Sequence, residues 1–191
     1  MRVAGYTVVL DACVLYPAPL RDLLIEIAAG GLFRARWSNQ IHSEWISSLL
    51  TKRADLSIAQ LQRTRELMDA AIEGAQVYGF EPLIDALSLP DPDDRHVLAA
   101  AIHSGSDGIV TYNIRDFPAD TVRQYEIEIL HPDDFLTQQF GLDAAAVVLA
   151  AQRCRARLKY PPLGARDYLD VLRRQSLPLT TAELAAFADL I

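Results

Sequence analysis

One stretch of this chain constrains its fold most. It contains an apolar helix that follows acidic residues, and then a short buried strand that leads into a polar turn. Residues 89–117 have the sequence LPDPDDRHVLAAAIHSGSDGIVTYNIRDF. Three carboxylates, Asp91, Asp93 and Asp94, come directly before the helix, and residues 107–111 form the strand. Helices that alternate with buried strands are typical of α/β folds, in which polar groups at the strand ends gather in one crevice. The pattern therefore predicts an α/β domain with negative charge at one edge of its sheet.

A first buried strand is expected near the N-terminus. Residues 6–10 (YTVVL) form a short apolar run rich in β-branched residues, which is typical of a parallel strand covered on both faces. Asp11 interrupts the run at once, so the N-terminal stretch indicates a strand and not a signal peptide. An unpaired carboxylate in a core is costly, so Asp11 either caps the next helix or belongs to a site at the strand end.

Further segments continue the alternation of helices and strands. Ser38 is a natural N-cap for a helix on which Glu44 stands close to the apolar stripe. A longer helix is expected to bury Leu61, Leu67, Met68, Ala71 and Ile72. The expected elements are a helix from Pro19 to Gly30, a strand at 33–37, helices at 39–52 and 57–77, and an edge strand at 126–130.

The acidic cluster before the central helix has two explanations. Asp91 fits an N-cap, Pro92 the first helical residue, and Asp94 the third position of a capping box. Alternatively, Asp94 coordinates a metal ion, since it stands one turn before Leu98 on the side that faces the strand ends. A cap and a ligand can coexist here, and the sequence leaves open which of the three carboxylates would be the ligand.

The C-terminal part is predicted to be entirely helical, which divides the chain into a domain at 1–141 and a helical extension at 142–191. Helices are expected at 142–159 and 165–175, followed by a last helix capped by Thr180. The domain carries 11 basic and 20 acidic side chains, a net charge of −9, whereas the extension carries 7 and 5, a net charge of +2. An acidic domain of this kind does not offer a large basic surface to nucleic acid, so it would need divalent cations to bind one.

Other residue types exclude several classes of protein. No uncharged run approaches the length of a membrane span, so no membrane segment is expected. Cys13 and Cys154 give no disulfide framework, which suits the cytoplasm. The four histidines, at positions 42, 96, 103 and 131, form no ligand cluster and are expected at the surface or in helix caps.

The acids and the polar turn together resemble PIN-domain proteins, the family of metal-dependent ribonucleases that includes VapC toxins. The resemblance rests on Asp11 after the first strand, Glu44 in the second helix, Asp94 in DDRHVLAAA, and Asn113 with Asp116 in TYNIRDF. It covers residues 3–135 and implies a three-layer, Rossmann-like α/β fold, with a mostly parallel sheet flanked by helices. The helical extension lies outside the motif.

The resemblance also implies a site and its chemistry. Asp11, Glu44, Asp94 and Asp116 are the implied catalytic residues, supported through hydrogen bonds by Thr111 and Asn113. Asp11, Asp94 and Asp116 would hold Mg²⁺ or Mn²⁺, and Glu44 would orient a metal-bound water. Carboxylates crowded in one crevice repel one another, and a hard divalent cation relieves that repulsion. The expected substrate is RNA, and the expected partners are a cognate antitoxin protein and a second copy of the chain.

Three other functions compete with this hypothesis. A PIN-fold protein that binds a partner with weak or no catalysis would keep the fold but not all of the acids. A phosphohydrolase with a nucleophilic aspartate needs a general acid two residues after Asp11, where this chain has Cys13. An acidic-pocket receiver domain needs a lysine after a late strand, and none stands there. The presence of all four acids favours the nuclease.

Overall fold

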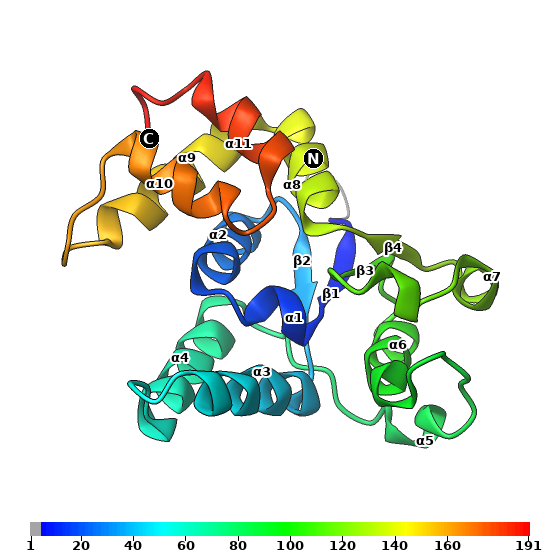
Figure 1. The fold of residues 1–191 in the computed structure, drawn as a ribbon. Coiled ribbons are helices and arrows are strands. Elements are labelled where there is room, and N and C mark those ends of the chain that lie inside the picture. The colour runs from blue at the N-terminus through cyan, green and yellow to red at the C-terminus, as the bar shows by residue number, and fades with distance from the viewer. Residues whose placement is uncertain (1–4) are drawn as a thin grey trace.

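Four parallel strands form the centre of the protein (Figure 1), in a computed structural model that describes residues 5–191. The strands lie in the order β2-β1-β3-β4, and each neighbouring pair is parallel. The central strand β1 is fully buried because helices cover both of its faces, as its apolar run predicts. The strands are β1 (Thr7–Leu10), β2 (Arg34–Arg36), β3 (Gly108–Val110) and β4 (Glu128–Leu130).

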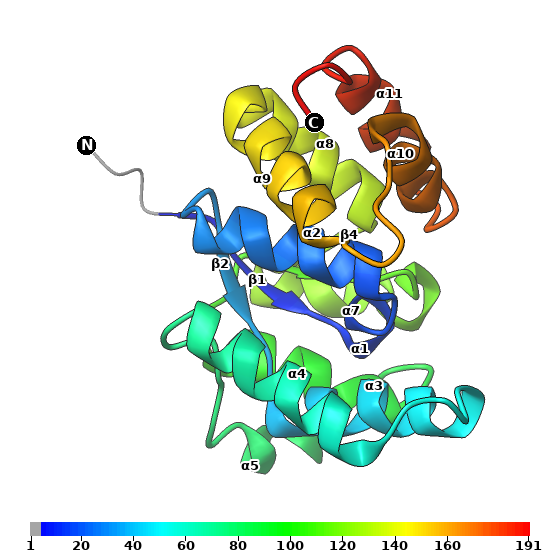
Figure 2. The ribbon, with the colours of Figure 1, turned by 90° about the vertical axis from the view of Figure 1, so that its left-hand side faces the viewer.

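Helices cover the two faces of the sheet and give the predicted three-layer α/β architecture (Figure 2). One layer contains α2 (Ala18–Ala29), α8 (Pro132–Leu142) and α9 (Ala144–Arg157), and the other contains α3 (Asn39–Lys52), α4 (Ile58–Ala71) and α6 (Arg95–His103). In residues 5–191, no helix combines the length and the apolar character that crossing a membrane requires. The short elements are α1 (Ala12–Leu15), α5 (Glu81–Ile84), α7 (Ala119–Val122) and the 3₁₀ turns η1 (Pro92–Asp94), η2 (Ile114–Asp116) and η3 (Arg123–Tyr125).

The helix expected at 57–77 is shorter than predicted, since α4 ends at Ala71. Ile72 is extended and Gly74 has a φ of +75°, a conformation that favours glycine and stops the helix. The next residues pair with the end of β2: the N–H of Trp37 donates to Ala75 O (3.0 Å), and the N–H of Val77 to Trp37 O (2.8 Å).

The core face expected for this helix is also partly wrong. Leu61 and Met68 are buried, whereas Leu67 is 54% exposed and Ala71 is exposed too. A helix that ends at residue 71 places only a narrow stripe of apolar residues against the core. The apolar residues of 75–77 are buried instead because they pair with the edge of the sheet.

The C-terminal helices α10 (Ala165–Arg173) and α11 (Pro178–Ala185) lie in the layer that contains α8 and α9 (Figure 1). The prediction that Thr180 caps the last helix is wrong, because the helix already begins at Pro178. The cap comes from the buried Asp133 of α8, whose carboxylate accepts from the N–H of Leu179 (2.9 Å), the N–H of Thr180 (2.8 Å) and the Thr180 hydroxyl (2.7 Å). A carboxylate at a helix N-terminus bonds the free amides and opposes the helix dipole. This contact fastens α11 to α8.

The strand expected at 126–130 is confirmed as the edge strand, although β4 begins only at Glu128. Glu126 adopts a left-handed conformation with a φ of +57°, so the chain turns there before it can join the sheet.

Candidate active site

Asp11 stands where β1 ends and α1 begins, at the carboxyl edge of the sheet. Its side chain is 3% exposed. Oδ1 accepts from the N–H of Ala12 (2.6 Å), and Oδ2 accepts from the hydroxyl of Thr111 (2.6 Å) and the thiol of Cys13 (3.1 Å). Asp11 therefore caps α1 and is also fixed against the segment that follows the neighbouring strand.

Thr111 reaches Asp11 because of the strand register. Leu10 of β1 pairs with Val110 of β3, so the residues that follow the two strands lie side by side. The fully buried Thr111 hydroxyl donates to Asp11 and accepts from the N–H of Asn113 (2.9 Å). One hydroxyl thus connects the carboxylate after β1 to the polar turn after β3.

Asp94 approaches from the start of α6 and is half-buried. Burial, followed by the negative charges of Asp11, Asp116 and Asp91, raises its pKa to about 7. Asp91 caps η1 by accepting from the N–H of Asp93 (2.9 Å), as predicted. The predicted capping box is wrong, since the Asp94 side chain makes no cap hydrogen bond. The Asp94 carboxyl is thus not occupied in capping, and it lies in the field of three other carboxylates.

Glu44 reaches the same region from α3 and contacts His96 of α6. Its Oε1 lies 2.6 Å from Nε2 of His96, although without the alignment of a regular hydrogen bond. His96 is 2% exposed, and its Nδ1 has no hydrogen-bond partner among residues 5–191.

The expectation that the histidines are surface or capping residues is therefore wrong for His96 and for the fully buried His42. It is confirmed for the exposed His103 and for His131, which caps α8.

One cavity of about 330 Å³ brings most of the predicted site residues together. Asp11, Glu44, Asp94 and Asn113 line it, and Thr111 is bonded to Asp11. Asp116 does not line the cavity, but its charge acts on Asp94. As the side chains of residues 5–191 are placed, no three His, Cys, Asp or Glu residues form a ready metal-binding group.

Several lining residues were not predicted from the sequence. The cavity also contains Tyr16, Ser48 and Lys52, and the Lys52 ammonium lies 5.2 Å from the centre of the Tyr16 ring. Helical spacing could have found two of them, because Ser48 and Lys52 follow Glu44 at intervals of four residues. A cation at the rim of an acidic cavity is placed to attract an anionic substrate.

The raised pKa of Asp94 predicts that the metal-free protein loses stability as the pH rises. Between about pH 4 and pH 7, folded Asp94 keeps a proton that the unfolded chain, in which this carboxyl has its ordinary pKa of 3.8, releases. The free energy of unfolding therefore falls over this window. After allowance for solvent screening of the half-buried carboxyl, the expected loss is about 1–2 kcal/mol, or roughly 5 °C in Tm.

Thermal unfolding in EDTA, followed by circular dichroism at several pH values, measures this loss. Asp94→Asn, which cannot ionise, should show a smaller decrease than the wild type. The prediction fails if the two proteins lose stability equally over that pH range.

Comparison with known proteins gives two family matches and one curated relative. The family described as "PIN domain" matches residues 7–115, and the family described as "VapC50 C-terminal domain" matches residues 132–186. The relative is a Mycobacterium tuberculosis protein named "Putative ribonuclease VapC50", which is 38% identical over 101 residues. The alignment covers 53% of this chain and 59% of the relative. No solved structure matches the chain.

Proposed function

The chain belongs to the PIN-domain family, and on that premise we propose that it is a metal-dependent endoribonuclease that hydrolyses RNA phosphodiester bonds. The observation that carries the proposal is the convergence of Asp11, Glu44 and Asp94 on one cavity from three different elements. Burial, together with the negative charges of Asp11, Asp116 and Asp91, raises the pKa of Asp94, and a divalent cation would relieve this crowding of carboxylates.

The donor atoms of the site fit Mg²⁺ or Mn²⁺, because they are carboxylate and amide oxygens. Mg²⁺ usually keeps several waters and needs only one or two carboxylates, so the lack of a ready three-ligand group in residues 5–191 is compatible with it. We assign Asp11 and Asp94 as direct or water-mediated ligands, with Asp116 completing the shell. When bound, such an ion lowers the pKa of a water and neutralises charge on the phosphoryl oxygens.

The remaining residues orient the site. Thr111 holds the Asp11 carboxylate through its hydroxyl and also accepts from the N–H of Asn113. Glu44 is proposed to orient the attacking water, and the contact with buried His96 limits the positions that its carboxylate can take. Lys52 lies at the cavity and would attract the RNA backbone.

We further propose that the chain is the toxin of a toxin–antitoxin pair that acts in the cytoplasm. The likeness to the mycobacterial relative supports this role, as does the match of the C-terminal helices to the family named after it. The expected partners are an antitoxin protein and a second copy of the chain. Cys13 and Cys154 are free, which fits a reducing compartment.

RNA cleavage by the purified protein tests the proposal. Cleavage of single-stranded RNA is expected with Mg²⁺ or Mn²⁺ and should stop in EDTA, because the divalent ion is proposed to activate the water that attacks the phosphodiester. Restoring the divalent ion should restore the rate, whereas Ca²⁺, which prefers more ligands and longer bonds, should support cleavage poorly. A rate that is the same with and without EDTA would contradict the proposal.

A further inference from the structure

The segment of residues 153–166, here called the basic segment, differs in charge from the rest of the molecule. Its sequence, RCRARLKYPPLGAR, contains five basic residues and no acidic one, on a chain with a net charge of −7. It comprises the end of α9, the connection to α10 and the first two residues of α10. The catalytic assignment uses none of these residues.

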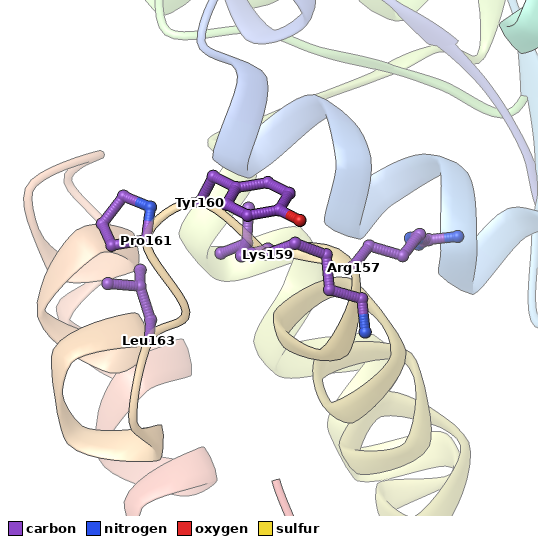
Figure 3. A pocket seen from close by; sticks show the side chains of 6 residues that line it. Arg157, Lys159, Tyr160, Pro161 and Leu163 are labelled. Atoms are coloured by element: carbon purple, nitrogen blue, oxygen red, sulfur yellow. The ribbon is translucent and has the colours of Figure 1, made fainter.

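The connection between α9 and α10 surrounds an open hollow of about 550 Å³ (Figure 3). The hollow is lined by residues 157–161 and Leu163. Two contacts hold the loop in shape: Lys159 and Pro162 form an antiparallel bridge, and Arg155 donates from Nη1 to Leu163 O (3.0 Å). The hollow is therefore formed by a structured loop.

Tyr160 is 99% exposed at this hollow, so its ring contributes no packing to the fold. A single exposed aromatic residue is ordinary on a protein surface. Here, however, cationic side chains flank it on the same loop, and Lys159 forms no ion pair within residues 5–191. Aromatic rings combined with cations are what single-stranded nucleic acid binds: the bases stack and the phosphates are neutralised.

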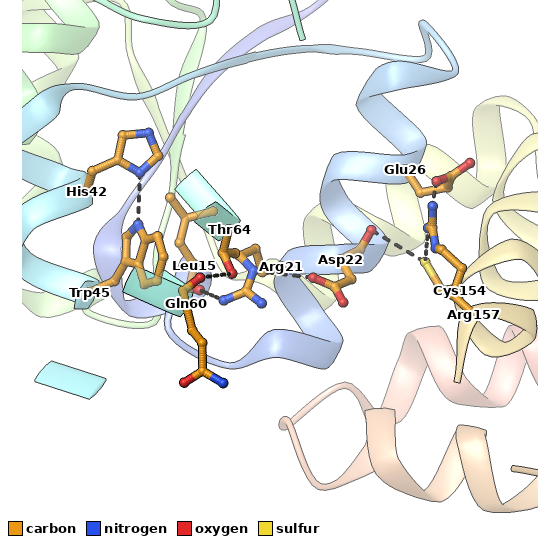
Figure 4. A network of polar contacts seen from close by, with 10 residues as sticks. All are labelled: Leu15, Arg21, Asp22, Glu26, His42, Trp45, Gln60, Thr64, Cys154 and Arg157. Carbon is orange, nitrogen blue, oxygen red and sulfur yellow. Dashed lines mark hydrogen bonds and ion pairs between the residues drawn. The ribbon is translucent and has the colours of Figure 1, made fainter. Parts of the chain in front are cut away.

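Two arginines of the basic segment, Arg153 and Arg157, contact one carboxylate of α2, that of Glu26, and Figure 4 shows Arg157 at this carboxylate. Glu26 accepts from Arg153 Nη1 (3.2 Å) and from Arg157 Nη2 (2.7 Å), and its side chain is 14% exposed. The two arginine side chains remain 57% and 59% exposed. One carboxylate neutralises only one of two guanidinium groups, so a positive charge remains and its position is fixed before any ligand binds.

We propose that the basic segment is an RNA-binding site outside the catalytic cavity, which stacks a base of a single-stranded substrate on Tyr160 and binds the adjoining phosphates through Arg157 and Lys159. The inference rests on the proposed function, since it names how the same substrate is held. The α9–α10 connection lies beside α2, on the side where α1 follows β1 (Figure 2), and the Cys154 thiol contacts Asp22 O of α2 (3.4 Å). A substrate with single-stranded RNA beside the cleaved bond would reach from the catalytic cavity to the basic segment.

Binding of labelled single-stranded RNA to full-length protein, measured by fluorescence anisotropy in an Asp94→Asn background, tests the site without cleavage. Adding Tyr160→Ala should weaken binding about 10-fold, the effect of losing one stacked base, whereas Tyr160→Phe should retain the affinity. Lys159→Ala should lower the slope of log K against log salt by about 0.7, the value for one phosphate contact on a single strand.

The matched control is Tyr78→Ala. Tyr78 is also exposed (64%), but no lysine or arginine occurs between residues 66 and 94. This variant should bind RNA like its parent. All these side chains are exposed, so unfolding temperatures should not change.

Cleavage kinetics separate this inference from the proposed function. In the otherwise wild-type protein, Tyr160→Ala should raise KM for a long single-stranded RNA and leave kcat unchanged. If the wild type cleaves RNA with Mg²⁺ but Tyr160→Ala changes neither KM nor RNA affinity, the inference is wrong and the proposed function stands. It is equally wrong if the variant binds RNA normally and instead loses affinity for a protein partner. Weaker RNA binding by Tyr160→Ala supports the inference even in a chain that shows no cleavage.

Discussion

Asp94→Asn is expected to lower the rate of RNA cleavage about 1000-fold while it raises the stability of the metal-free protein. The activity falls because a neutral amide attracts a divalent ion less than a carboxylate does and supplies only one oxygen, and a loss of several kcal/mol in the transition state corresponds to this factor. The stability rises because the substitution removes a carboxyl whose charged form is disfavoured by burial and by the negative charges of Asp11, Asp116 and Asp91. A merely structural role for Asp94 would not move the two quantities in opposite directions.

The neighbouring acids provide the controls for this experiment. Asp93 is exposed and Asp91 caps η1, so Asp93→Asn and Asp91→Asn should keep cleavage within about threefold of the wild type, as surface changes of about 0.5 kcal/mol do. Single-turnover rates and Tm in EDTA should be measured for all three variants. Loss of activity in Asp93→Asn with activity retained in Asp94→Asn would move the ligand to the other carboxylate.

Asp11→Asn should also abolish cleavage, but its interpretation is less direct. Both carboxylate oxygens of Asp11 accept hydrogen bonds, from the N–H of Ala12 and from the Thr111 hydroxyl. An asparagine presents only one oxygen, so either the cap of α1 or the contact with Thr111 is lost. We therefore expect this variant to lose stability as well as activity, which makes Asp94→Asn the sharper test.

The sequence was sufficient to predict features that depend on local pattern and strand order. The apolar run before Asp11 predicts a buried strand, and parallel strands bring the residues at their carboxyl ends together, as Asp11 and Thr111 show. Glu44 could be placed on its helix through the N-cap at Ser38, which accepts from the N–H of Ile41.

Features that depend on a distant partner could not be predicted in this way. The cap of α11 comes from Asp133, more than forty residues earlier in the chain, whereas the local pattern indicated Thr180. The end of α4 depends on pairing between residues 75–77 and Trp37. The periodicity of apolar residues in a helix gives no sign of such a pairing.

The burial of His96 was missed for a related reason. Residues 96–101 of α6 are buried without interruption, so this helix has no polar face in that stretch that would mark one residue as inward and another as outward. A histidine in such a segment gives no periodic signal, and its pairing with Glu44 appears only when α3 and α6 are placed together.

His96→Ala is expected to lower kcat about 10- to 100-fold, the range found when the partner of a site residue is removed. The pair fixes Glu44, whose side chain is 37% exposed and would otherwise move into solvent. KM for RNA should change little, because the fully enclosed His96 cannot contact the substrate. The measurement is a kcat and KM determination, combined with the same determination for Glu44→Ala and for the double variant.

The coupling between the effects of the Glu44 and His96 substitutions on kcat distinguishes a positioning role of His96 from a general loss of stability. If His96 acts through Glu44, the double variant should be little slower than Glu44→Ala alone, because the second substitution removes an interaction that no longer exists. His96→Gln, which keeps a donor near Nε2, should recover part of kcat. Leu172→Ala, a fully buried change in α10 at a residue that does not line the cavity, should lower Tm by a similar amount without lowering kcat of the folded protein. Equal losses of kcat in Leu172→Ala and His96→Ala, or additive effects of the Glu44 and His96 variants, would show that His96 serves only packing.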